Sequence, residues 1–341
     1  MTAPTEHPGL SLPALEAHLR AQLPRLLQGP LSAQLVAGGR SNLTYVLSDG
    51  VTRWVLRRPP LGHVLATAHD VAREHRLLAA LTPTDVPVPR PLLLAGEEVL
   101  GAPFYVMEFA DGVVLRDRAD LERLSPQAAT GLADELVDVL GRLHAVDPAA
   151  VGLADLGRPQ GYLVRQLDRW SRQVQASGTR DVTGLERLAE RLAESRPGEQ
   201  PSALVHGDYR LDNVVVDDDL RVVAVLDWEM ATQGDPLADL ASIVVWWDGF
   251  RGLDSPVAAV PGDVAGFPDG QHLVDAYQSC TGRDVSALPW YLGFAFYKIA
   301  AIFEGIHSRA QQGLTVGDGF ELLGGLVPEL VERGTAALDA G

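Results

Sequence analysis

The sequence of 341 residues contains one cysteine, Cys280, and one lysine, Lys298. A lone cysteine excludes an intrachain disulfide and a zinc site built from several cysteines, which is typical of a protein in a reducing compartment. Lysine is scarce among the 28 basic residues, which indicates a genome-wide preference for arginine because surface lysine has no physical disadvantage. An arginine where a lysine is expected is therefore weak evidence against a function.

Positive charge and long apolar runs are also in short supply. The 28 basic residues face 45 acidic ones, and the net charge of −17 repels nucleic acid and anionic membranes, so we expect neither as a partner. The apolar stretches over 243–247 and 294–303 are short or interrupted and fit buried helices better than a bilayer crossing. Residues 1–10 lack the basic start and apolar core of a signal peptide, so we expect a cytoplasmic protein.

What is present is a well-buried globular composition, 46% apolar and 21% charged, with sheet signals first and helix signals later. Leucine spacing predicts a leading helix over 11–27. Short runs of strand formers over 31–36, 43–47 and 51–57, with turns at Gly38-Gly39 and Asp49-Gly50, predict an antiparallel meander. A helix over 71–81 and a hairpin-like return over 99–109 follow, up to a bend at 110–112.

From residue 125 onward the periodicity is helical. Helices are predicted from 125, over 163–174 and 185–192, from Asp235-Pro236, and over 273–277, 290–307 and 320–331. Short strands over 203–206, 213–216 and 221–226 interrupt them. This order predicts an α+β protein of two lobes, with an N-lobe over 1–110 and a mainly helical C-lobe over 111–341.

The most informative segment is 204–213, followed by 225–229. It places Asp208 and Asn213 at the spacing of a kinase catalytic loop, and Asp227 follows a second apolar run, where kinases carry a metal-binding aspartate. Phosphoryl transfer needs a carboxylate that orients the acceptor, which predicts Asp208 as the catalytic base. Asn213 and Asp227 offer the hard oxygen ligands that Mg²⁺ prefers. Taken singly these residues would only form turns, and their joint spacing favours the functional interpretation.

Candidates for nucleotide binding lie in the predicted N-lobe. The glycine-rich turn over 38–42, with Gly39 and Ser41, occupies the place of the kinase turn that covers the phosphates, although an ordinary hairpin turn would explain it equally well in isolation. Arg57 ends the third strand, where kinases hold a phosphate-binding lysine, and Glu74 in the next helix could pair with it. Exposed surface arginines are the alternative.

Other polar and aromatic residues have more than one interpretation. The backbone at Glu108 and Ala110, where a buried strand enters the bend, could pair with adenine. His206 is predicted to hold the loop backbone in preference to acting as a base, and Asp235 to cap a helix. The aromatic residues over 290–309 could line an acceptor site, but an aromatic-rich helix is more often core.

On these residues the sequence resembles the aminoglycoside phosphotransferase and choline kinase superfamily, which has a protein-kinase-like fold, over about 31–331. The segments that carry the resemblance are 206–213, 226–229 and 234–241. The resemblance implies that Asp208 is the base, that Asn213 and Asp227 hold Mg²⁺, and that Asp239 supports the loop. Within the superfamily, segments 55–60 and 226–229 look most like bacterial phosphotransferases similar to the kinase domain joined to some acyl-CoA dehydrogenases, which resemble kinases of hydroxyacyl compounds.

We therefore expect a kinase that uses ATP and Mg²⁺ to phosphorylate a hydroxyl group of a small-molecule acceptor. Glu229, where typical antibiotic kinases carry glycine, disfavours an aminoglycoside acceptor. The alternatives are an aminoglycoside or choline-like kinase, a catalytically silent pseudokinase that binds nucleotide, and a metal-dependent hydrolase that uses the same acids. The sequence reveals neither the acceptor nor the oligomeric state.

Overall fold

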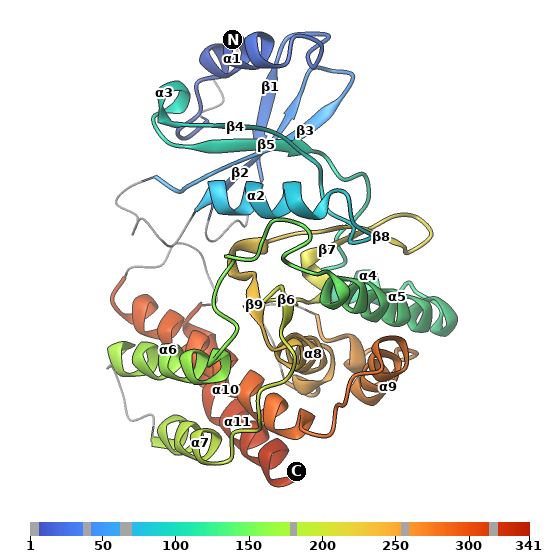
Figure 1. Cartoon of the computed structure of the whole chain (residues 1–341), viewed down its shortest axis with the longest axis vertical. Coiled ribbons are helices and arrows are strands. Elements are labelled where there is room, and N and C mark those ends of the chain that lie inside the picture. Colours follow the sequence, from blue (N-terminus) through green and yellow to red (C-terminus); the bar gives the residue numbers. More distant parts are fainter. Residues whose placement is uncertain (1–6, 37–41, 62–69, 178–182, 254–258, 314–319) are drawn as a thin grey trace. The chain divides into compact units, whose positions relative to one another are not determined.

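The computed structural model describes residues 7–36, 42–61, 70–177, 183–253, 259–313 and 320–341. The chain divides into two compact units, each described by itself below (Figure 1). The first unit comprises Met1–Gly112 together with Val223–Glu229, and the second comprises Val113–Val222 and Met230–Gly341. The later segment belongs to the first unit because, for example, the Val225 N–H donates to the Pro87 carbonyl at 2.8 Å.

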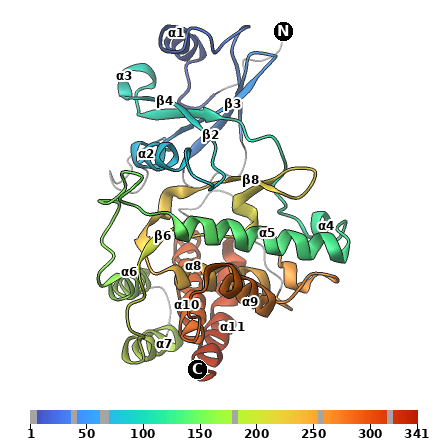
Figure 2. The same ribbon diagram turned by 45° about the vertical axis from the view of Figure 1, so that its right-hand side comes forward.

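The first unit is built on a five-stranded antiparallel sheet in the order β1-β2-β3-β5-β4. Its strands are β1 (Ser32–Leu35), β2 (Leu43–Ser48), β3 (Arg53–Arg58), β4 (Pro91–Ala95) and β5 (Phe104–Glu108). Helices α1 (Leu12–Gln22) and α2 (Val71–Leu81) cover opposite faces of this sheet, and the single turn α3 (Glu97–Leu100) joins β4 to β5 (Figures 1 and 2). The sheet therefore has one face under α1 and the opposite face under α2.

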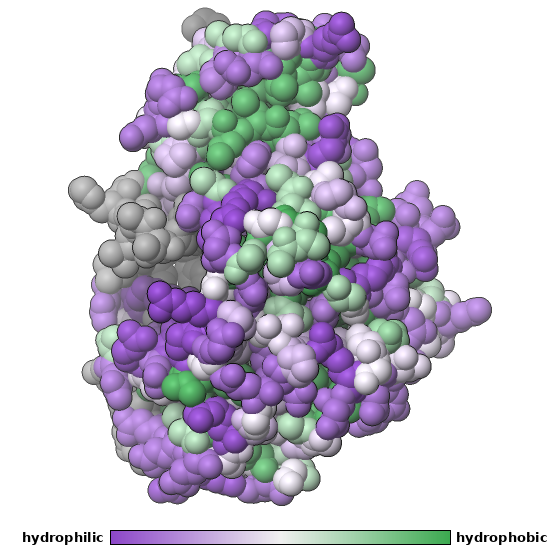
Figure 3. Space-filling view, viewed as in Figure 1, coloured by the Kyte–Doolittle hydropathy of each residue, from purple (hydrophilic) through white to green (hydrophobic). Residues whose placement is uncertain are grey.

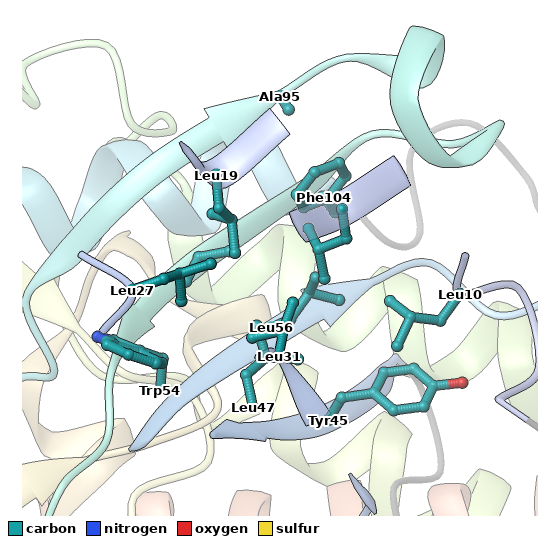
Figure 4. Packing of buried hydrophobic residues seen from close by; sticks show 12 residues of the cluster. Leu10, Leu19, Leu27, Leu31, Tyr45, Leu47, Trp54, Leu56, Ala95 and Phe104 are labelled. Atoms are coloured by element: carbon teal, nitrogen blue, oxygen red, sulfur yellow. The ribbon is translucent and has the colours of Figure 1, made fainter. Parts of the chain in front are cut away.

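The face under α1 forms the core of the first unit (Figure 4). Leu19 of α1 packs against Leu47, Leu56 and Phe104 of the sheet, all of them fully buried. In β3 the alternation places Trp54, Leu56 and Arg58 on this side, and Val55 and Arg57 on the other. The strand period thus decides which of the two adjacent arginines lies on the α2 side, and it is Arg57.

Some predicted boundaries in this unit were wrong. The first helix ends at Gln22 and not at residue 27, because Pro24 cannot continue a helix and restricts the residue before it. Strand β4 was not predicted, since its leucine run after a proline carries no alternation. Residues 97–100 are helical, so the predicted return over 99–109 begins as a strand only at Phe104.

The turn between β2 and β3 is held by one carboxylate. Asp49 accepts hydrogen bonds from the backbone N–H groups of Gln28 at 2.7 Å, Val51 at 2.9 Å and Thr52 at 2.8 Å. Together these hydrogen bonds lower the pKa of Asp49 to about 2, and the bond from Gln28 has the largest effect. The ionised carboxylate therefore ties the chain after α1 to the hairpin.

Substitution Asp49→Asn should lower the melting temperature at pH 7, because a neutral amide is a weaker acceptor for three N–H donors. A depressed pKa gives stability that is present above the unfolded value of 3.8 and lost as the pH falls towards 2. The difference in urea midpoint between wild type and variant should therefore shrink from pH 5 to pH 3. An unchanged difference over that range would contradict this account.

The second unit is mainly helical, which confirms the predicted α+β class. Its α-helices in the described residues are α4 (Arg118–Leu121), α5 (Pro126–Ala145), α6 (Tyr162–Ser177), α7 (Thr183–Glu194), α8 (Pro236–Val244), α9 (Gly270–Thr281), α10 (Leu288–Gln311) and α11 (Phe320–Asp339). Helices α5, α8 and α9 pack side by side, and α10 packs along α11 (Figures 1 and 2). Their neighbours α6 and α7 also contact α10.

Short strands thread these helices. Strand β6 (Ala203–Val205) pairs antiparallel with β9 (Thr232–Gly234), and β7 (Val214–Val216) follows a 3-10 turn over Leu211–Asn213. Strand β8 (Val222–Val225), which belongs to the first unit from Val223 on, leads into a second 3-10 turn, Trp228–Met230. β9 was not predicted, and Asn213 belongs to the turn and not to the strand predicted over 213–216. Asp235 caps α8 by accepting from the Leu237 N–H at 3.1 Å, as predicted.

The surface is mostly polar in the view of Figure 3, with an apolar area on the first unit. Large apolar side chains that this unit exposes include Leu35 on β1 and Leu94 on β4, the two edge strands of the sheet. None of the described helices combines the length and the apolar character that a bilayer-spanning segment requires.

Candidate functional site

The loop after β6 carries the predicted base, and a buried aspartate of α8 fixes its backbone. Asp239 accepts from the N–H of His206 at 2.6 Å and from the N–H of Gly207 at 2.8 Å. The His206 ring, also fully buried, accepts through Nδ1 from the Asp208 N–H at 3.2 Å. His206 therefore makes the contact with the loop backbone that its predicted structural role requires.

A chain of buried groups holds Asp239 in turn. The His144 ring lies between the Tyr277 hydroxyl, 2.7 Å from Nδ1, and the Asp239 carboxylate, 3.4 Å from Nε2. Burial lowers the pKa of His144, which keeps the ring neutral. Burial would raise the pKa of Asp239, but the bonds from His144 and the backbone amides outweigh it and lower that pKa. Asp239 is thus an ionised anchor for the loop.

Gly207 is required by the same geometry. Its φ of +85° lies in the left-handed region, and a Cβ at this position would come within 2.8 Å of the Met230 carbonyl oxygen. The close approach lets β6 turn sharply before Asp208. Here the glycine serves the backbone path and not a ligand.

Asp208 and Asn213 meet across this turn. The Asn213 Nδ2 donates to the Asp208 backbone oxygen at 2.8 Å and to Asp208 Oδ2 at 3.0 Å. The amide is thereby oriented with its nitrogen towards the predicted base, which leaves its oxygen as a possible metal ligand. The 3-10 turn that ends at Asn213 brings the two side chains together over five residues.

Arginine and tryptophan flank the base on the other side. Arg210 lies 3.4 Å from Asp208 Oδ2 through Nε and 3.0 Å from Asp212 Oδ2 through a terminal nitrogen. Its guanidinium also covers the Trp246 ring at 4.5 Å. Burial raises the pKa of Asp212, and Arg210 opposes that rise. Asp212 is therefore a partner of Arg210.

A cavity opens beside Asp208 within the second unit. It is lined by Tyr162, Gln166, Gly207, Asp208, Ala238, Asp239, Ser242, Trp246, Phe294, Ala295, Lys298, Ile299 and Ile302. Of the aromatic residues that α10 contributes, Phe294 lines this cavity, whereas Tyr291, Tyr297 and Phe303 are core side chains. Most of the aromatic helix is therefore core, the more common of its two predicted roles.

In the first unit, Arg57 lies between two acidic side chains. Its Nε is 3.4 Å from Glu74 Oε2, and a terminal nitrogen is 3.4 Å from Asp227 Oδ1. Glu74 is 3% exposed and also accepts from Tyr105 at 2.9 Å and Asn42 at 3.1 Å. Burial raises the pKa of Glu74, and the Arg57 charge opposes this. The Arg57–Glu74 pair thus has the position that the sequence predicts, and Asn42 and Tyr105 are partners that it did not reveal.

Breaking this pair should be costly. Arg57→Met leaves Glu74 buried without its cation, which should lower the free energy of unfolding by about 3 kcal/mol at pH 8. Protonation of Glu74, whose folded pKa is raised, removes its buried charge as the pH falls towards 4.5. The decrease in the free energy of unfolding should therefore be smaller at pH 5. Urea unfolding at both values measures it. The matched Arg57→Met, Glu74→Gln double variant should be less destabilised and should lose the pH dependence, and a persistent dependence would exclude Glu74 as its source.

Asp227 has an unusual backbone. Its φ is +61°, and among the described residues other than glycine only Leu220 shares this left-handed conformation. Such a conformation costs about 1–2 kcal/mol for a residue with a side chain, and it persists where the surroundings or a function require it. A small cavity beside it is lined by Arg57, Leu78, Pro89, Tyr105, Met107, Val225, Leu226, Asp227 and Trp228.

The remaining predicted contacts are less complete. Gly39 and Ser41 lie outside the described residues. Glu108 ends β5 and its N–H donates to the Arg90 carbonyl at 2.9 Å, so adenine bound at this edge must pair with other backbone groups. Ala110 follows β5 and is half-buried. Across the described ranges, no three His, Cys, Asp or Glu side chains form a cluster that could hold a metal, a result compatible with Mg²⁺, which needs only one or two protein oxygens.

Comparison with known proteins identifies the family. The sequence model of the phosphotransferase enzyme family matches residues 32–271, which is more than half of the chain. The chain belongs to the phosphotransferase enzyme family. Members of the family and this chain therefore share the segment that carries Arg57, Glu74, Asp208, Asn213 and Asp227.

Individual relatives agree with this membership. Human acyl-CoA dehydrogenase family member 11 is 33% identical over 330 residues, 94% of this chain but 42% of that protein, so the chain spans less than half of this curated relative. A candidate aminoglycoside phosphotransferase from Ralstonia eutropha is 32% identical, covers 97% of this chain and 98% of its own, and has a TM-score of 0.82. The phosphotransferase fold extends to aminoglycoside phosphotransferase APH(4)-Ia in complex with AMP-PNP and hygromycin B, at a TM-score of 0.61 and 16% identity over 96% of this chain and 98% of that one. The fold is thus the kinase-like fold of these proteins.

Proposed function

We propose that this phosphotransferase moves the γ-phosphate of ATP to a hydroxyl group of a small metabolite. The observation that carries the proposal is the pair Asp208 and Asn213, in which the amide nitrogen faces the carboxylate on a loop anchored by Asp239. Kinases use this arrangement to place an acceptor-orienting carboxylate next to a metal-binding amide oxygen. Aminoglycoside phosphotransferase APH(4)-Ia, which shares this fold, is in complex with AMP-PNP, and this supports ATP as donor.

The chemistry follows from the residues. Asp208 accepts the hydroxyl proton while the hydroxyl oxygen bonds to the γ-phosphorus and the bond to the β,γ-bridging oxygen of ATP breaks, leaving ADP. Arg57, fixed by Glu74, binds the phosphates with a rigid fork in place of the usual lysine. The small cavity lined by Arg57 and Met107 lies next to Glu108 in the chain, and the backbone at Glu108 and Ala110 is the predicted binding site of adenine.

The donor set also suits Mg²⁺. The Asn213 amide oxygen and the Asp227 carboxylate are hard ligands, and magnesium held by them would neutralise charge on the transferred phosphoryl group. Asn213 and Asp227 are thus the proposed metal ligands.

The Arg57 Nε is buried without a hydrogen bond, although it lies at ion-pair distance from Glu74, and an anionic phosphate oxygen would satisfy it.

The acceptor is proposed to be a hydroxyacyl compound, because curated relatives of the chain include acyl-CoA dehydrogenase family members. The test is a screen of hydroxyacyl, sugar, aminoglycoside and amino-alcohol acceptors, with ADP release measured with and without Mg²⁺. Acceptor-stimulated, Mg²⁺-dependent ADP release is the expected result. Failure to bind ATP in a calorimetric titration would exclude the kinase, whereas tight binding without turnover would favour the pseudokinase.

A further inference from the structure

The lone lysine of the chain lies beside the predicted base. Lys298 is half-buried in α10, and its Nζ donates to the Gly207 carbonyl at 2.5 Å, one residue before Asp208. The ammonium is also 5.8 Å from the centre of the Trp170 ring. It carries three donors, and Gly207 takes one of them. In the sequence this residue stands out only as a lysine within the apolar stretch over 294–303.

Lys298 shares its cavity with an apolar wall and with Asp208. Ile302 lies one turn further along α10 on the same face, and Phe294 lies one turn before it. Both line the cavity together with Asp208 and Lys298, and Gln166 of α6 adds an amide. A ligand in this cavity would therefore meet a cation, an apolar surface and the base at the same time.

Local charge points to the class of ligand. Lys298 is the one cation among the described residues that line the cavity, beside the carboxylates of Asp208 and Asp239, whereas Arg210 lies outside this lining and is ion-paired with Asp208 and Asp212. The net charge of −17 attracts cations over the whole surface, but salt screens such fields beyond about 8 Å. At about 4 Å an interaction between two charges near the surface reaches about 4 kcal/mol, so direct contact with Lys298 outweighs the distant surface charge for an anionic group of the ligand.

We propose that Lys298 sets acceptor specificity by binding a carboxylate or carbonyl oxygen of the acceptor, whose aliphatic part lies against Phe294 and Ile302 and whose hydroxyl reaches Asp208. This inference rests on the proposed kinase function and narrows its substrate class. It predicts acids, esters or thioesters with a hydroxyl group as acceptors. Lys298 is then a residue that contacts substrate, in addition to holding Gly207.

The test compares three sets of acceptors with the same chain length: medium-chain hydroxycarboxylic acids, their methyl esters and the corresponding amino alcohols. Lys298→Met should raise KM for the acids about 10- to 100-fold, the range for one lost charged hydrogen bond, and change kcat less than threefold. Lys298→Arg should keep the preference for acids, and Lys298→Glu should reverse it in favour of amino alcohols. Arg309→Met, an exposed cation on the same helix, is the matched control and should behave as wild type.

The opposite pattern would overturn the inference. If Lys298→Met lowers kcat equally for all three sets and leaves KM unchanged, Lys298 only holds the loop. If the wild type transfers no phosphate, the same compounds are titrated into protein saturated with AMP-PNP and Mg²⁺ to measure acceptor binding alone. If acids then bind more tightly than amino alcohols and Lys298→Met abolishes this preference, the role of Lys298 is supported although the kinase proposal fails. Equal binding of acids and amino alcohols contradicts it. Thermal unfolding identifies a variant that does not fold, in which case Lys298→Arg and Lys298→Glu give the answer.

Discussion

Substitution Asp208→Asn should lower kcat about 10²- to 10⁴-fold, the usual contribution of a general base. The variant keeps the shape of the side chain, and the Asn213 Nδ2 bond to the Asp208 backbone oxygen at 2.8 Å does not depend on the carboxylate. The loop should therefore stay folded and ATP should bind with unchanged affinity, because Asp208 is proposed to contact the acceptor. Acceptor-stimulated ADP release measures kcat, and calorimetric titration of ATP measures the affinity for ATP.

The control for this experiment is Asp219→Asn, which removes an exposed carboxylate from the turn after β7. It should leave kcat, KM and ATP affinity as in wild type. Undiminished ADP release in Asp208→Asn would contradict the assignment of Asp208 as the catalytic base. Loss of ATP binding in the same variant would show that Asp208 acts on the nucleotide and not on the acceptor.

The second large effect concerns Asp227. Asp227→Asn and Asp227→Gly should each lower Mg²⁺-dependent turnover at least about 100-fold, since even residues that only support a metal ligand cost 10- to 100-fold when changed. Stability should change by less than about 1 kcal/mol in Asp227→Gly. Glycine relieves the left-handed strain at φ +61°, and this gain offsets the greater freedom of the unfolded chain and the loss of a half-exposed ion pair with Arg57.

Leu220 is the matched control, because it has almost the same backbone conformation, φ +59°, without a carboxylate. Leu220→Gly should hold or raise the melting temperature and leave turnover unchanged. Measuring turnover against Mg²⁺ concentration together with urea unfolding separates the two effects. If Asp227→Gly turned over at the wild-type rate, the strained conformation would serve the fold alone and Asp227 would not hold the metal.

Much of the fold follows from local sequence. Helix α2 begins and ends at the predicted residues 71 and 81, and the α8 cap formed by Asp235 was also predicted. The strands β4 and β9 escaped prediction because their residues carry no alternation, and pairing with β5 and β6 makes them strands. In these places tertiary hydrogen bonding overrides weak local preference.

Local sequence alone was enough to predict that Asp208 and Asn213 meet, since they lie five residues apart and a single turn brings them together. It also determined which arginine of β3 faces Glu74, because strand alternation is a local property. The resemblance implied that Asp239 supports the loop, but its two backbone amide partners, the His144 ring behind it and the place of Lys298 beside Asp208 came only from the tertiary structure. Those contacts join residues about 30 to 95 positions apart, where burial and packing, and not spacing along the chain, select the partners.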